Sequence, residues 1–496
     1  MDICKNLDKQ KNKSEIELCA KYFRQAGHHT FAKQAYLRLG DLKALMGLHV
    51  ELHKWDEAKM LAKQNPEMEA VIWLPHADWL SANDRFDEAQ EAYKKAGRPD
   101  LSLRIIEFLT YNAVIEKRFQ DAAQYYWMLS AESLRLVKET GEKASKEDKK
   151  FSASFEEYMK LSEIYQAYHL IHKFIEESYQ AVIQGPLFNE AIFNASRFLI
   201  SNLGKRQPLG ISKVYIYYAL SILGFRFEAY KTARVGYEKM QQLKIPTQWQ
   251  EEIDLANLKC RSKPYSDKEG FQVICNRCMN SNSLINHAGD FCTGCGQGFV
   301  RNMIGFDTLP LVEFVPAPHI AHKRVLECLR ADPPEEGGGF AGLKAPAKKA
   351  GRAHQDGWQE NGNAHGDEQT LTFNNNQEDD MDNDLFTQKM LEQLETQVNP
   401  DSNKPVEVDE RVLQNMRYEE VYVVDHSRLC PNQPRRFYKN MVPDVSVTMC
   451  ESCCKCFLQD EYEFAYIEKG HCPFCKNVEK DKGVKNVYGS LADMRS

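Results

Sequence analysis

The sequence lacks the short motifs that mark most enzymes. It contains no Walker A lysine, no H-E-x-x-H pair and no nucleophile elbow. The glycines of Gly337-Gly-Gly339-Phe-Ala-Gly342 match a dinucleotide-binding turn only formally, because no strand pattern precedes them and no helix pattern follows. No histidines or carboxylates stand at a spacing that selects acid–base chemistry over surface charge. We therefore expect a protein that is not an enzyme.

Long hydrophobic runs and an excess of positive charge are also missing. The longest apolar stretch, near residues 214–225, is bounded by Lys213 and Arg226 and predicts a buried helix, so no membrane insertion is expected. Met1-Asp-Ile leads into a charged run without the apolar core of a signal peptide, which favours a soluble intracellular protein. The formal net charge of -7 argues against nucleic-acid binding and favours protein partners.

Cysteine, by contrast, is abundant and patterned. Eight of the 15 cysteines form two sets of C-x2-C pairs, namely Cys275, Cys278, Cys292 and Cys295, and Cys450, Cys453, Cys472 and Cys475. Two such pairs separated by a hairpin let four thiolates converge on one tetrahedral Zn²⁺. Four protein ligands leave no position for water or substrate. We therefore expect two structural zinc sites, each preceded by a strand-like run as in a zinc ribbon.

The second set has an alternative register. Cys453-Cys454-Lys455-Cys456 contains an overlapping C-x2-C pair, and His471 precedes Cys472 as a candidate substitute ligand. The lead-in Ser446-Val-Thr-Met-Cys450 parallels Phe271-Gln-Val-Ile-Cys275, which favours Cys450 and Cys453 and leaves Cys456 in reserve. The remaining cysteines without a partner at metal spacing are expected to be small buried hydrophobic residues: Cys4, Cys19, Cys260, Cys328 and Cys430.

A repeated helical pattern runs from about residue 14 to residue 260. Its anchor alanines are Ala32, Ala58, Ala89 and Ala122, spaced by 26, 31 and 33 residues, and aromatic residues recur beside them. This period is typical of tetratricopeptide-like helix pairs, in which a small residue lets two helices approach closely. The sequence thus predicts a mainly α fold, an α-solenoid followed by small β-rich zinc modules. At helical spacing the aromatic residues indicate core rather than a peptide-binding stripe.

Composition divides the chain into four parts. They are a helical solenoid (1–263), a first zinc-ribbon module (264–330), an acidic and polar linker (331–405) and a second β/zinc-binding module (406–496). The linker has too few aliphatic residues to offset the entropy of ordering, so we expect it to be disordered. Within it, Asp384 to Leu394 has helical apolar spacing and is either a partner-binding or a transient helix. The sequence leaves open whether the two zinc modules pack together.

These features, in this order, closely resemble the carboxy-terminal half of the intraflagellar transport protein 122 family. The resemblance is carried by Ala96-Gly-Arg-Pro-Asp100, by Cys275-Asn-Arg-Cys278 with Cys292-Thr-Gly-Cys295, and by His471-Cys-Pro-Phe-Cys475. It covers the helical region and both zinc modules. Members of the family begin with two WD-repeat propellers, of which this sequence has none, so a fragment or truncated product is expected.

The resemblance implies a non-enzymatic scaffold subunit of the IFT-A complex. That role includes retrograde intraflagellar transport, cilium assembly and ciliary protein trafficking, in the cilium or flagellum, at the ciliary base and in the cytoplasm. The implied partners are IFT-A subunits of the WD-repeat and tetratricopeptide types, and indirectly dynein-2 and IFT-B trains. Two alternatives remain: a vesicle-coat or tethering subunit of the coatomer or vacuolar-sorting type, and a zinc-ribbon nucleic-acid-binding factor.

Overall fold

A computed structural model describes most of the chain. The described residues are 12–64, 69–137, 146–176, 185–204, 207–286, 289–330, 384–396, 405–427, 429–430 and 433–478. They divide into two compact units. The first comprises the described residues of 1–265, 426–433 and 471–478, and the second comprises those of 266–425 and 434–470. The predicted disorder of residues 331–383 lies outside the described residues.

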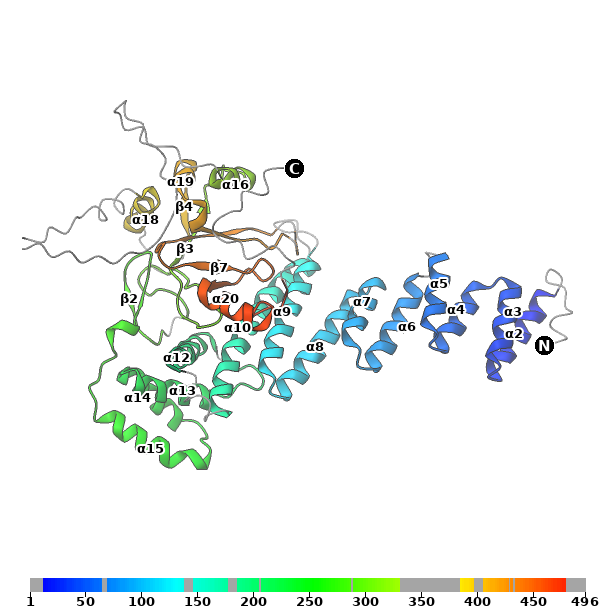
Figure 1. Cartoon of the computed structure of the whole chain (residues 1–496), viewed down its shortest axis with the longest axis horizontal. Coiled ribbons are helices and arrows are strands. Elements are labelled where there is room, and N and C mark those ends of the chain that lie inside the picture. Colours follow the sequence, from blue (N-terminus) through cyan, green and yellow to red (C-terminus); the bar gives the residue numbers. More distant parts are fainter. Residues whose placement is uncertain are drawn as a thin grey trace, which may run out of the picture. The chain divides into compact units, whose positions relative to one another are not determined.

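The first unit is a helical solenoid. Its described helices are α2 (Lys13–Gln25), α3 (His29–Leu39), α4 (Leu42–Glu51), α5 (Trp55–Gln64), α6 (Glu69–Ala82), α7 (Phe86–Lys95), α8 (Pro99–Ile115), α9 (Phe119–Arg135), α10 (Lys146–Glu176), α12 (Gly185–Asn202), α13 (Lys213–Arg226), α14 (Tyr230–Gln241) and α15 (Thr247–Arg261). Each packs on the next along the chain (Figure 1). This succession of neighbour contacts confirms the predicted mainly α solenoid.

One turn recurs between the helices of successive pairs. Its central residue has a positive φ, and the next amide donates to the carbonyl five residues before it, as from Arg118 N to Ala113 O at 2.8 Å. Gly40 and Gly97 form this turn between one helix pair and the next, and within the pairs the positive-φ residues are Gly27, His53, Asp84, Lys117 and Glu228. The anchor alanine lies five residues after each within-pair residue, and Ala32, Ala58, Ala89, Ala122 and Ala233 are all fully buried. The four predicted anchors are thus core residues. Ala233 is a fifth, which the sequence analysis missed because α10 and α12 interrupt the period.

The predicted helix near residues 214–225 is α13. Ile216, Ala219, Leu220 and Leu223 are at most 1% exposed, so the apolar stretch is buried in the solenoid. Within the described residues, no helix is both long enough and apolar enough to span a membrane. The apolar content of α13 therefore serves packing between helices.

Two short segments from the end of the chain are built into the first unit. Leu429 and Cys430 join the buried cluster of Leu134 and Val137 at the end of α9. The His426 ring lies 5.4 Å from Phe155 of α10, centroid to centroid. Lys476 Nζ forms an ion pair with Asp121 of α9 at 2.8 Å. These segments extend the core of the solenoid with residues that sequence order alone would assign elsewhere.

The second unit is built on a four-stranded sheet of order β4-β3-β6-β5. Its strands are β3 (Leu311–Pro316), β4 (Val406–Val408), β5 (Val421–Val424) and β6 (Arg436–Asn440). β3 pairs in parallel with β4 and antiparallel with β6, which pairs antiparallel with β5. β3 comes from the first predicted zinc module and the other strands from the second. The two modules therefore share one sheet.

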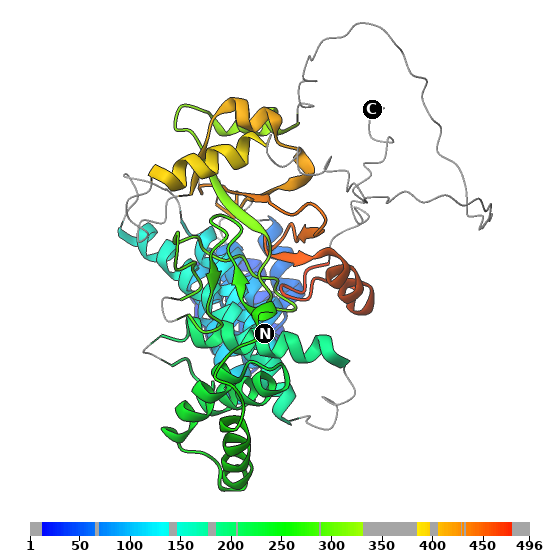
Figure 2. The same ribbon diagram turned by 90° about the vertical axis from the view of Figure 1, so that its left-hand side faces the viewer.

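Three helices complete the core of this unit: α16 (His322–Arg330), α18 (Leu385–Thr396) and α19 (Glu410–Asn415). Figures 1 and 2 show them together on one side of the sheet. Phe386 is 0% and Met390 2% exposed, and the Phe386 ring lies 5.8 Å from Phe314 of β3. This corrects the predicted linker: α18 is neither disordered nor waiting for a partner, because its apolar face packs against the sheet of its own chain.

Candidate metal centres

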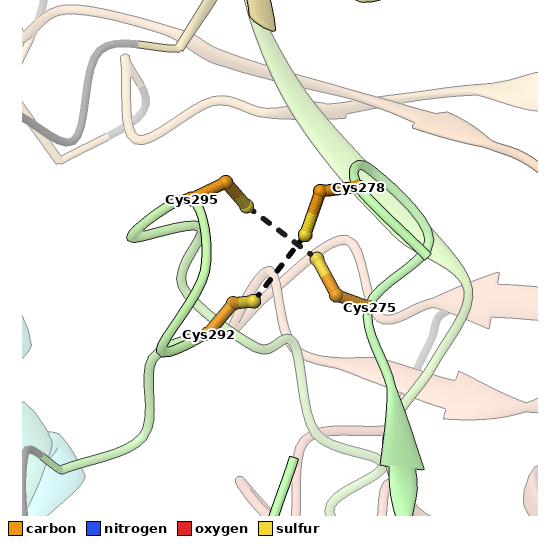
Figure 3. Close-up of side chains that lie close together, drawn as sticks. All are labelled: Cys275, Cys278, Cys292 and Cys295. Atoms are coloured by element: carbon orange, nitrogen blue, oxygen red, sulfur yellow. Dashed lines mark hydrogen bonds between the residues drawn. The ribbon is translucent and has the colours of Figure 1, made fainter. Parts of the chain in front are cut away.

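The first cysteine set lies in the second unit and is closely convergent. The hairpin of β1 (Val273–Ile274) and β2 (Ser281–Asn282) carries Cys275 and Cys278 in its turn, and a following loop carries Cys292 and Cys295. Figure 3 shows the four sulfurs pointing toward one another, with 3.6 Å from Cys275 Sγ to Cys295 Sγ and from Cys278 Sγ to Cys292 Sγ. Ligands ~2.3 Å from a tetrahedral zinc lie about 3.8 Å apart. The observed spacing fits that geometry.

Hydrogen bonds reach these sulfurs from the backbone, from a side-chain amide and from one another. The Gly294 amide donates to Cys292 Sγ at 3.3 Å, and the Asn282 amide group donates to the same sulfur at 3.6 Å. A hydrogen bond from the Cys295 thiol lowers the pKa of Cys275 to about 5, and the same contact raises the pKa of Cys295. Four cysteine sulfurs this close together are the donor set of a closed zinc site.

The second cysteine set is equally compact. The sulfurs of Cys450, Cys453, Cys472 and Cys475 all lie within 4.8 Å of one another, and all four residues are at most 3% exposed. All eight sequence-predicted cysteines therefore come together in two groups of four. In the described part of the chain, no third group of histidine, cysteine or carboxylate ligands reaches this density.

The four C-x2-C turns share one backbone geometry. The residue after the second cysteine has a positive φ, and its amide donates to the carbonyl of the first cysteine at 2.8–3.0 Å. These residues are Met279, Gly296, Cys454 and Lys476. The left-handed residue after the second cysteine is thus common to all four turns.

This geometry bears on the register of the second set. In the first hairpin Ile274 pairs with Ser281, and in the hairpin of β7 (Val447–Met449) and β8 (Cys456–Leu458) Met449 pairs with Cys456. Cys456 thus occupies the place of Ser281, a strand residue beyond the turn. It packs with Leu309, Leu311 and Val447, and burial raises its pKa to about 12. An apolar site with a high thiol pKa indicates that Cys456 is a core residue rather than a ligand of the second metal.

The other candidate ligands lie outside the sulfur clusters. Cys454 Sγ donates to Asp425 O at 3.5 Å, and His471 Nδ1 lies 3.0 Å from Cys472 O. Cys260, Cys328 and Cys430 are buried as small residues, Cys19 is half-buried, and Cys4 lies outside the described residues. The burial of Cys260, Cys328 and Cys430 supports the prediction that these three pack rather than bind metal.

A fifth turn has the same backbone geometry but no cysteine, and the sequence analysis missed it. Asn302 N donates to Asp307 O at 3.0 Å, Phe306 N donates to Asn302 O at 2.9 Å, and Phe306 has a φ of 54°. The fully buried Asn302 side chain donates to Asp307 Oδ1 at 2.9 Å and to Glu461 Oε2 at 2.7 Å. Hydrogen bonds here hold the turn that metal ligation would hold elsewhere.

Comparison with known proteins agrees with this architecture. Residues 1–215 match the family described as "IFT122, TPR domain", and residues 268–312 match "IFT122, zinc ribbon domain". An intraflagellar transport protein 122 homolog of Danio rerio is 36% identical over 476 residues, covering 96% of this chain and 37% of the relative. That of Homo sapiens is 35% identical over 483 residues, covering 97% and 36%.

The chain spans a little over a third of the length of these curated relatives. The two family matches together nevertheless cover the helical repeats up to residue 215 and the first cysteine set. The likeness to the relatives extends over nearly all of this chain, the second cysteine set included. On this evidence the chain belongs to the intraflagellar transport protein 122 family.

Proposed function

We propose that the chain is a non-enzymatic scaffold subunit of the IFT-A complex. The observation that carries the proposal is the family match of a solenoid joined to zinc-ribbon modules whose sulfur clusters are closed. A solenoid presents a long surface of repeated faces, suited to contact with other extended subunits. A closed cluster stabilises a fold and leaves no position for a substrate.

The zinc modules supply rigid parts of that scaffold. We assign one Zn²⁺ to Cys275, Cys278, Cys292 and Cys295, and one to Cys450, Cys453, Cys472 and Cys475. Bound zinc supplies folding free energy to modules too small to be stabilised by apolar burial alone. The surrounding residues position the sulfurs through their turns and amide hydrogen bonds, and they exclude water.

The proposed setting follows the family. The chain acts in retrograde intraflagellar transport, cilium assembly and ciliary protein trafficking. It contacts IFT-A subunits of the WD-repeat and tetratricopeptide types, and connects indirectly with dynein-2 and IFT-B trains. It resides in the cilium or flagellum, at the ciliary base and in the cytoplasm. A vesicle-coat subunit would share the solenoid plan, and a nucleic-acid factor would share the ribbons.

Affinity purification of the tagged chain from ciliated cells tests this proposal, with the bound proteins identified by mass spectrometry. We expect IFT-A subunits at near-stoichiometric levels. The purification is repeated with Cys450→Ser, which removes one proposed zinc ligand. Cys456→Ser is its matched control, because both variants change a buried cysteine of the same hairpin. Recovery of coat subunits instead would favour the vesicle-coat alternative. Salt-dependent binding to nucleic acid without IFT-A subunits would favour the third reading.

A further inference from the structure

Helix α20 (Gln459–Lys469) exposes an unusual pair of apolar side chains. Phe464 is 73% and Ile467 83% exposed, more than any other large hydrophobic residue in the described part of the chain. They are three residues apart and therefore lie on one face of the helix. Single exposed apolar residues are ordinary, but two on adjacent turns of one face form a patch that contact with a partner would bury.

Contacts made by other residues of the helix fix α20 in the second unit. Tyr462 is 8% exposed, and its ring lies 4.9 Å from Phe457 of β8. Asn302 donates to Glu461, and α20 packs on both β7 and β8. Figure 2 shows the helix, in dark red, beside this hairpin. The exposed pair is thus presented by an anchored helix, which lowers the ordering cost of binding.

The patch is flanked by negative charge. Asp460 lies one turn before Phe464, Glu468 one turn after it, and Glu463 one turn before Ile467. Within the described residues none of these three carboxylates forms an ion pair, although Glu463 accepts a hydrogen bond from Gln459 at 2.8 Å. An apolar centre with an acidic border is complementary to an apolar segment that carries lysine or arginine.

We propose that this face of α20 docks a basic amphipathic segment of a partner protein, with apolar anchors on Phe464 and Ile467 and cations beside Asp460, Glu463 and Glu468. Other occupants fit the charges less well. A second copy of the same face would oppose carboxylate to carboxylate, and anionic lipid or nucleic acid would be repelled. The inference goes beyond the scaffold role, because it specifies a surface and the chemistry of its partner without depending on which complex is bound.

The test places a photo-crosslinking benzoylphenylalanine at position 464 of the full chain in ciliated cells and identifies the crosslinked peptide by mass spectrometry. We expect one segment with net positive charge and apolar residues at helical spacing. The triple variant Asp460→Lys, Glu463→Lys, Glu468→Lys should reduce the crosslink about tenfold. The same probe at exposed Lys469, on another face of α20, is the control. Retained zinc content and helicity show that the variants fold.

Several results would overturn the proposal. They are no crosslink above the Lys469 control, a crosslink to an acidic segment, to lipid, to a second copy or to this chain itself, or a crosslink that charge reversal leaves unchanged. The same experiment distinguishes failure of the IFT-A proposal from failure of this one. A basic crosslinked segment from a protein outside IFT-A would contradict the proposed complex while supporting this docking face.

Discussion

Asp384 shows how one side chain can decide whether a helix joins a core. Its carboxylate pairs with Lys439, a residue 5% exposed, and accepts hydrogen bonds from Phe386 N at 3.2 Å and Thr387 Oγ1 at 3.0 Å. Burial alone would raise the pKa of Asp384, but the hydrogen bonds and the Lys439 charge outweigh it and lower the pKa. The residue thus caps α18 and neutralises a buried cation at once.

We predict that Asp384→Ala destabilises the second unit by about 3–5 kcal/mol, because it removes the carboxylate that neutralises the buried Lys439 ammonium and leaves only the Phe386 ring beside it. Asp384→Asn should cost less, since it keeps a cap acceptor. Chemical denaturation, monitored by hydrogen exchange in α18, measures the change in the free energy of unfolding. Asp444→Ala, at an exposed residue, is the control and should change stability by no more than ~0.5 kcal/mol.

The same pair predicts a pH dependence. The folded pKa of Asp384 lies below its ordinary value of 3.8, so the unfolded state binds the proton more readily. The stabilisation is therefore complete above the unfolded pKa and is lost as the pH falls through the folded one. An acid-unfolding curve of Asp384→Asn as steep as that of the unchanged chain would contradict this.

A further prediction for single residues concerns which cysteines bind the second zinc. Cys450→Ser should release one zinc, whereas Cys456→Ser should retain it, because Cys456 is a strand residue packed on Leu309 and Leu311. Elemental analysis of the purified variants in reducing buffer decides between them. The opposite pattern of loss would move the ligands to Cys453, Cys456, Cys472 and Cys475.

At the scale of elements, the recurring left-handed turn of the solenoid carries a conformational cost that glycine would avoid. Lys117 has a φ of 59°, and its ion pair with Glu176 is solvent-exposed, at 3.4 Å. Lys117→Gly should therefore raise the stability of the solenoid by about 0.5–1 kcal/mol, measured by urea unfolding with circular dichroism. In the interior of α10, Lys160→Gly should lower it by about 1 kcal/mol. A loss of stability in both variants would argue against the turn geometry.

Local patterns predicted most of the elements but not how they pair. The anchor alanines and C-x2-C pairs lie within a few residues of the partners that give them meaning, so spacing alone identified them. The turn at Asn302 was missed because no sequence spacing marks a side-chain amide that donates to Asp307 and Glu461. Glu461 is 159 residues away from Asn302. The place of α18 was missed because its partners also lie far away in the sequence: Lys439 is 55 residues from Asp384, and Phe314 precedes Phe386 by 72 residues.

At the scale of the whole molecule, the first metal centre and α18 are coupled within the second unit. Leu394 of α18 packs against the buried cluster of Cys275, Cys292 and Cys295. Cys275→Ser should lower the bound zinc from two ions to one, since structural zinc contributes on the order of 10 kcal/mol to a small module. Hydrogen exchange should rise in the ribbon and in α18.

The helices of the solenoid should be unaffected by Cys275→Ser, because repeats depend mainly on their nearest neighbours. Their exchange rates within α2 to α8 serve as the internal control. Two zinc ions in the variant would exclude Cys275 as a ligand. Melting of the whole solenoid would show that the two units unfold as one.

The shared sheet also sets the timing of folding during synthesis. β3 is an inner strand, and its residue Phe314 pairs with Val406 of β4, 92 residues later in the chain. At ~5–20 residues per second, β3 emerges roughly 5 to 18 s before β4 can pair with it. During that interval Leu311, Val312 and Phe314, all at most 3% exposed in the finished fold, have no sheet to enter. The nascent chain must therefore keep an aggregation-prone strand apart from its neighbours on the polysome, which makes this unit a strong client for chaperones acting at the ribosome.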